Sequence, residues 1–241
     1  MRKSRMLYAI TAAAIGGMVI MCNQNNAPTD PPDNPEPPPG NVIFSEGFEG
    51  YAGNQLDTVD LYRKITYDPA QGWMSISTQH ARSGMCSLTS DSNNTSIKRR
   101  MDQYLEDSIA GLQFYLMATT AVHTNIFAAL CKPGSSRDGL VTKYGLGIDK
   151  SDSLNYVYED YLNGINERVN FAPLALNKWY KCKIEYDYSD TTLSYSVDDT
   201  VIYSQPAPNP LTLQTFVVLR DSMGAQGPSG CYIDDVTIYK R

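Results

Sequence analysis

From residue 41 onward the sequence predicts an all-β fold, and two observations predict it. First, apolar and polar residues alternate along the chain. Between 180 and 186 the even positions are Tyr180, Cys182, Ile184 and Tyr186, and the odd positions are charged. A period of two indicates a strand with one buried face. Second, Tyr, Thr, Ser, Val and Ile dominate, with frequent Gly, Asn and Asp, and no ten-residue segment has a helical period. Many short strands with regular turns predict a sandwich or barrel.

The strands follow one another with turn signals between them. Asp198-Asp199 separates two strands and is expected to form the turn of a tight hairpin. Further turns are expected at 132–134, 138–139 and 163–164. The expected strands are 42–48, 73–78, 85–90, 95–101, 109–117, 124–131, 141–149, 154–161, 179–187, 193–197, 200–203, 213–220 and 231–239.

The chain divides into three parts. Residues 1–22 are expected to be an export signal, because three basic residues precede an uncharged run of 16 residues, which is short for a membrane span. Residues 23–40 hold seven prolines and no large apolar residue, so they favour an extended spacer. Residues 41–241 are expected to be a single folded domain.

Cys22 ends the apolar run. The stretch 19–22 resembles the lipobox of bacterial lipoproteins, which implies that Cys22 is lipidated and anchors the chain to a membrane. Met21 departs from that pattern, which normally has Gly, Ala or Ser before the cysteine. An ordinary signal peptide cut elsewhere and an uncleaved anchor are the alternatives.

The charge of the chain argues against nucleic acid as a partner. The formal net charge is −6, and removing residues 1–22 leaves 17 of the 20 basic side chains against all 26 acidic ones. An acidic domain repels phosphate backbones. The longest block of like charge, Lys98-Arg99-Arg100, is expected to be a solvated strand edge.

Three segments carry a resemblance to a known family: the opening 44–51, the strand 179–187 with its hairpin, and the closing 232–239. Together they resemble the concanavalin A-like lectin/glucanase superfamily, and most closely its laminin-G-type jelly rolls. The resemblance covers about 41–241. It implies a jelly-roll sandwich of two antiparallel sheets in which the first and last strands pair, with glycan binding as the commonest theme. The superfamily also contains hydrolases and lyases, so the fold does not fix the function.

No catalytic set is recognisable. Glucanases of this superfamily carry Glu-x-Asp-x-x-Glu, but Glu159 and Asp160 are adjacent and would point to opposite faces of a strand. Lyases of this type use Gln-x-His, but Gln113 is followed by Phe114 and Tyr115. The two histidines, His80 and His123, are expected at the surface.

A structural calcium ion is the cofactor that the resemblance implies. Jelly-roll binding modules often hold one between an early glutamate and an acid of the last strand. Glu46, Glu49, Asp234 and Asp235 stand in comparable places and offer oxygen ligands. The alternative is that these acids only solvate strand ends.

Glycan contact requires exposed rings and planar polar groups. The candidates are Trp73, Tyr156 and Tyr158 for stacking and Arg168 for hydrogen bonds, while Trp179 is expected in the core. The alternative for each ring is burial in the core.

Lipidation of Cys22 would leave an even number of cysteines. Cys86, Cys131, Cys182 and Cys231 are then expected either as disulfides, with three possible pairings, or as core thiols.

These observations favour an exported, lipid-anchored domain of the cell envelope that binds a polysaccharide or surface glycan without cleaving it. A polysaccharide lyase or glycoside hydrolase, and a structural surface module without a glycan, are the alternatives.

Overall fold

The computed structural model describes residues 40–51, 63–64, 74–90, 96–100, 105, 109–121, 125–133, 140–149, 153–160, 164–207, 215–221 and 230–241. The predicted signal segment and nearly all of the spacer lie outside these residues and stay predictions.

The described residues form fifteen strands and one short 3-10 helix, with no α-helix. The elements are β1 (Asn41–Glu46), η1 (Glu49–Tyr51), β2 (Arg63–Lys64), β3 (Met74–Ser77), β4 (Ser87–Ser90), β5 (Ser96–Arg100), β6 (Ile109–Ala118), β7 (Asn125–Pro133), β8 (Leu140–Ile148), β9 (Ser153–Asp160), β10 (Ile165–Pro173), β11 (Tyr180–Asp187), β12 (Thr192–Val197), β13 (Thr200–Pro206), β14 (Thr215–Asp221) and β15 (Cys231–Lys240).

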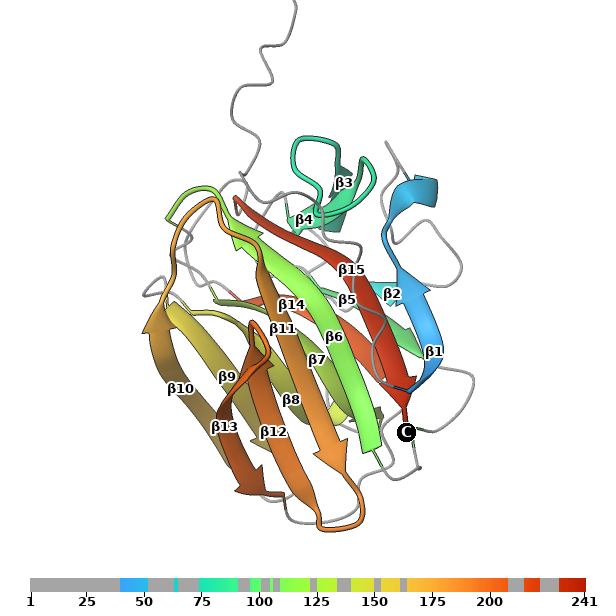
Figure 1. Cartoon of the computed structure of the whole chain (residues 1–241), viewed down its shortest axis with the longest axis vertical. Helices are drawn as coiled ribbons and strands as arrows, with labels where there is room; N and C mark the ends of the chain where they lie inside the picture. Colours follow the sequence, from blue (N-terminus) through green and yellow to red (C-terminus); the bar gives the residue numbers. More distant parts are fainter. Residues whose placement is uncertain are drawn as a thin grey trace, which may run out of the picture.

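The strands build two antiparallel sheets that pack face to face (Figure 1). The eight-stranded sheet has the order β13-β12-β11-β6-β15-β4-β3, and β1 pairs with β15. The seven-stranded sheet has the order β10-β9-β8-β7-β14-β5-β2. The predicted all-β, two-sheet antiparallel sandwich is confirmed. The expected pairing of the first and last strands is confirmed as well, with Phe44 opposite Ile238.

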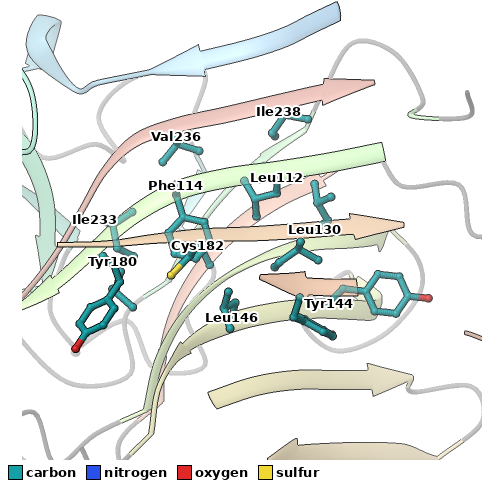
Figure 2. Packing of buried hydrophobic residues seen from close by; sticks show 14 of the residues in the cluster. Leu112, Phe114, Leu130, Tyr144, Leu146, Tyr180, Cys182, Ile233, Val236 and Ile238 are labelled. Atoms are coloured by element: carbon teal, nitrogen blue, oxygen red, sulfur yellow. The ribbon is translucent and has the colours of Figure 1, made fainter. Parts of the chain in front are cut away.

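The core lies between the two sheets (Figure 2). The alternation in β11 has the predicted effect: Tyr180, Cys182, Ile184 and Tyr186 are buried and their odd-numbered neighbours are not. From the opposite sheet, Tyr144 stacks on Tyr186 with the ring centroids 5.8 Å apart. Seven tyrosines are buried among the described residues, so packing explains much of the high tyrosine content: Tyr115, Tyr144, Tyr180, Tyr186, Tyr195, Tyr232 and Tyr239.

The Asp198-Asp199 hairpin forms as predicted, and both residues have positive φ. They are more than turn residues, because Asp198 pairs with Lys178 at 2.8 Å and Asp199 with Lys181 at 2.9 Å. Two expectations need correction. The strand β10 was not predicted, and Trp179 is half-buried ahead of β11 instead of fully inside the core.

The basic triplet 98–100 belongs to β5, which pairs with β14 from Ser96 to Arg100 and with β2 at Lys98. Lys98 is therefore paired on both sides, and the expected solvation of the triplet stays a prediction.

All four cysteines after Cys22 are free and buried, so the core-thiol alternative describes them. Cys182 stands opposite Phe114 and Cys231 opposite Ala118 on the same strand β6. Four residues of strand span about 13 Å, whereas bridged cysteines have Cα atoms about 6 Å apart. Burial raises the pKa of the Cys182 thiol, which favours the inert protonated form.

Candidate functional site

The pleat of the seven-stranded sheet gives it an inner face and an outer face. In β7, Ile126, Ala128 and Leu130 belong to the core, so Phe127, Ala129 and Cys131 alternate to the other side. Directly opposed residues of antiparallel strands share a face. The register therefore extends this outer face across all seven strands.

One row of the outer face runs through Phe127, Gly147, Asn155 and Asn170. The next row runs through Ala129, Gly145, Val157 and Arg168, and a third through Cys131, Lys143, Glu159 and Asn166. Asn166, Arg168 and Asn170 are exposed on the edge strand β10, whereas Phe127, Ala129 and Cys131 are buried.

Four polar residues and one aromatic ring lie near one another on this face. We name them the Asn155 cluster: Phe127, Asp149, Asn155, Arg168 and Asn170. Asn155 is 2 % exposed, and its side-chain oxygen Oδ1 is buried without a hydrogen-bond partner. The Asn170 amide Nδ2 donates to Asp149 Oδ2 at 2.8 Å. The Arg168 guanidinium lies over the Phe127 ring, 5.9 Å from its centroid. A buried acceptor without a donor is costly in a folded protein, so the cluster is suited to a ligand that donates a hydrogen bond to Asn155.

The register divides the three predicted glycan contacts in described strands between the two faces of the sheet. Trp73 lies outside the described residues. Tyr156 and Tyr158 stand opposite Leu146 and Tyr144, which are core residues, so the backbone register places both positions on the inner face. Arg168 stands on the outer face. Of the four predicted contacts, Arg168 is the one whose side chain belongs to the Asn155 cluster.

The four acids predicted to bind calcium lie near one another around the loop 78–86, but main-chain amides occupy most of their oxygens. Glu49 accepts from the amides of Met85 and Cys86 at 2.9–3.0 Å, and Asp234 accepts from the amides of Arg82 and Ser83. Glu46 accepts from the Phe48 amide at 2.8 Å. Among the described residues, no group of three or more His, Cys, Asp or Glu has metal-binding geometry.

The remaining place for a cation is at Asp235. The β15 register shifts between Asp234 and Thr237, and Asp235 has a left-handed φ of 47°. A bulge of this kind re-aims a side chain. Oδ1 of Asp235 accepts from the Ser83 hydroxyl at 2.6 Å, but Oδ2 is buried and has no partner. Asp234 Oδ1 also accepts from the Asp235 amide at 2.8 Å, so Asp235 Oδ2 is the oxygen of this pair that a cation could take.

The surroundings of Asp234 disfavour its charged form. Burial, followed by the neighbouring Asp235 carboxylate, raises the pKa of Asp234 to about 7. A cation beside the two adjacent carboxylates would relieve this repulsion.

The loop 78–86 also covers part of the eight-stranded sheet. Arg82 lies over the Tyr115 ring at 4.7 Å, and the His80 ring meets Tyr232 edge-on at 4.7 Å. Burial lowers the pKa of His80, which favours its neutral form. His80 is therefore a half-buried packing residue, whereas the sequence predicted it at the surface, and His123 lies outside the described residues.

The two acids at strand positions of the described outer face, Glu159 and Asp221, are too far apart for glycoside hydrolysis. Their rows are six residues apart, about 20 Å along the strands, whereas the two carboxyl groups of a glycosidase lie about 5–10 Å apart. The central strand β7 presents Phe127, Ala129 and Cys131 there, none of them acidic.

Sequence reasoning missed Asn155, Phe127 and Asn170. The signal was present in part, because Asn155 is a polar residue inside an apolar strand. However, β10 was unassigned, so Asn170 could not be placed beside it. The predicted lipidation site, Cys22, lies outside the described residues. None of the described elements is a helix with the length and hydropathy to cross a membrane.

Comparisons with known proteins support the fold alone. No protein-family model matches the sequence, and no curated protein is similar to it. A structure of the cellulose induced protein Cip1 is 14 % identical, with 82 % of this chain and 97 % of that chain covered and a TM-score of 0.59. The carbohydrate binding module CBM66 from Bacillus subtilis is 12 % identical, with 75 % and 96 % covered and a TM-score of 0.51.

A Bacillus licheniformis beta-glucanase is 14 % identical, with 84 % and 100 % covered and a TM-score of 0.52. The chain spans only 19 % of the length of a sialidase that it also matches. The structural neighbours are thus jelly-roll binding modules and glucanases, and the chain has their concanavalin A-like jelly-roll fold.

Proposed function

We propose that this protein is an exported, lipid-anchored domain of the cell envelope that binds a polysaccharide or surface glycan and does not cleave it. The anchor would be the acylated Cys22, and the spacer 23–40 would hold the domain away from the lipid. The fold of binding modules supports this proposal.

The observation that carries the proposal is the unpartnered Oδ1 of Asn155. Sugar hydroxyls donate hydrogen bonds, and this buried acceptor lies on the same face as the exposed donors Asn166 and Arg168. Arg168 provides a planar fork of donors, and the Phe127 ring below restricts the positions that the fork can take.

A polysaccharide panel tests this function. The full-length protein in detergent is run through native gels that contain single polysaccharides, and the same mixtures are assayed for released sugars. We expect retention without product. Because hydrogen bonds to a charged group are worth about 1.5–3 kcal/mol, Arg168→Gln should weaken retention at least about tenfold.

Arg241→Gln is the matched control, because it removes an exposed arginine on the other sheet, where it pairs with Glu185 at 3.1 Å. Equal losses in the two variants would contradict the placement of the site. Release of shortened or unsaturated sugars would replace the proposal with the hydrolase or lyase alternative, which the glucanase-like fold keeps open. Failure to retain any polysaccharide would favour a structural module.

We also propose that calcium binds at Asp235 and Asp234 and joins the first strand to the last. The ion would supply positive charge beside the buried Asp234 and the half-buried Asp235, and Gly47 at the end of β1 lies close to Asp235 Oδ1. A ligand at one hundred times its dissociation constant stabilises the native state by about 2.7 kcal/mol. Chelation should therefore lower the melting temperature by about 5–10 °C.

Calorimetry with and without chelator measures this effect. Asp235→Asn should abolish the response to chelator, whereas Asp187→Asn, a change of the same type at the end of β11, should leave it intact. A melting temperature that does not respond to chelator in the unmodified protein would contradict the proposed calcium site.

A further inference from the structure

The spacer enters the folded domain beside the end of the last strand. Asn41, the first residue of β1, stands opposite Lys240 of β15, and a Cβ added to Gly40 would lie 2.6 Å from the Lys240 carbonyl oxygen. Ile109, the first residue of β6, exchanges main-chain hydrogen bonds with Arg241 at 2.7 and 3.1 Å. We name this end of the eight-stranded sheet, formed by these five residues, the tether end.

The opposite end of the same sheet, which we name the far end, lies about 30 Å away. The strand β15 has ten residues, and a rise of about 3.4 Å per residue gives it this length. Its first residue, Cys231, stands opposite Ala118, whose carbonyl oxygen accepts from the Asn177 amide at 2.7 Å. The loop 174–178, which joins β10 to β11, therefore lies at the far end.

The Asn155 cluster lies toward the far end and on the other sheet. Asn155 stands opposite Asn170, which is near the end of β10 at Pro173, and the loop 174–178 follows directly. The cluster is on the outer face of the seven-stranded sheet, whereas the spacer joins the eight-stranded sheet. In Figure 1 the C-terminus and the start of β1 lie at the lower right, and the end of β10 lies at the left. The candidate site and the spacer are thus on opposite sides of the domain.

This arrangement limits what the site can reach. An acylated Cys22 would hold the domain through Gly40, so the tether end would face the membrane. The outer face near Asn155 would then point away from it. A glycolipid head group of the same membrane would have to reach around the domain, whereas a polymer outside the membrane meets the site directly.

We infer that the protein binds its polysaccharide in trans. The ligand lies on the side of the domain that is turned away from the anchoring membrane, and it is not a glycolipid of that membrane. This inference rests on the proposed lipid anchor and glycan binding, and it specifies where the partner must be. The protein would link its membrane to an external polysaccharide layer.

Two cysteine variants of the full-length protein test this orientation. Ser189 is exposed in the β11–β12 turn at the tether end, where Asp187 stands opposite Ile109, and it is changed in Ser189→Cys. Leu176 is 46 % exposed in the loop 174–178 at the far end, and it is changed in Leu176→Cys. The four described cysteines of the unmodified protein are buried, so a maleimide reagent should reach the new thiol in preference to them.

Each variant is placed in phosphatidylcholine vesicles that contain a maleimide phospholipid, which attaches the new cysteine to the bilayer. Beads coated with xylan, pectin, laminarin or chitin then capture the vesicles. We expect at least one coating to capture vesicles that carry the unmodified protein, and Ser189→Cys to be captured equally well. Attachment through Leu176→Cys should reduce capture at least about tenfold, because the site is turned toward the bilayer and cannot engage the bead. In detergent, both variants should bind the same polysaccharide as the unmodified protein does.

The failures of the inference and of the proposed function are distinguishable. Equal capture of the two attached variants, or a loss confined to Ser189→Cys, would overturn binding in trans and leave glycan binding in place. An unmodified protein that binds polysaccharide in detergent but does not stay with the vesicles would refute the anchor, and the inference with it. If no polysaccharide of this set or of the wider panel is retained in detergent, the proposed glycan-binding function itself fails.

Discussion

Replacing Gly147 with alanine will lower the free energy of unfolding by about 3 kcal/mol, the upper part of the usual range for overpacking. An added Cβ at this position would overlap the Ile126 carbonyl oxygen and would lie 2.5 Å from Phe127 Cα. These atoms belong to the backbone of the paired strand β7, so no side-chain rotation relieves the clash. The two strands must separate at the centre of the sheet.

Thermal unfolding measures the effect. For a domain of this size, 3 kcal/mol corresponds to a fall in melting temperature of about 6–12 °C. Gly50→Ala is the matched control, because an added Cβ there meets nothing within 4 Å and should change stability little. An unchanged melting temperature for Gly147→Ala would show that β7 and β8 are not paired in this register.

The second large effect concerns Asp234 and pH. With chelator present, stability should fall as the pH rises from about 4 to about 7. Burial and the Asp235 carboxylate raise the pKa of the folded carboxyl to about 7, against an ordinary pKa of 3.8 for aspartate. Between these values the folded chain binds one proton more than the unfolded chain, so the free energy of unfolding decreases with pH and is constant above 7. At about 1.4 kcal/mol per pKa unit, the loss is on the order of 4 kcal/mol.

Urea unfolding at pH 4 to 8 tests this slope in the unmodified protein and in Asp234→Asn, where it should disappear. Asp187→Asn is the control, because the pKa of Asp187 is shifted in the opposite direction. Hydrogen bonds from Ser189 lower the pKa of Asp187, so its contribution is lost only below about pH 4. Parallel curves for the unmodified protein and Asp234→Asn would contradict a buried, protonated Asp234.

The fold could be predicted because its signals are local. The alternation in β11 and the two aspartates of the hairpin each specify their own conformation, and the structure contains both. In contrast, β10 was missed because its side chains are exposed from Asn166 to Asn170, on both faces. An edge strand without a buried face has no period of two in its hydropathy.

The site was less predictable because it depends on register. Tyr156 and Arg168 are near each other in sequence, but their positions lie on opposite faces of the sheet. The acids 46, 49, 234 and 235 lie around the paired chain ends, and their binding of calcium stays a prediction. What the sequence could not reveal was that loop amides would take most of their oxygens, since that requires the path of the loop 78–86.

The place of β15 in the eight-stranded sheet has a consequence for biogenesis. This strand is the last described element in the chain, but it pairs with β6 on one side and with β1 and β4 on the other. Until residues 231–240 have emerged, β1 has no described partner and the sheet remains in two pieces. Long-range pairing of this kind delays folding. A polypeptide that cannot close its sheet during synthesis stays unfolded, which is the state that the proposed export would require.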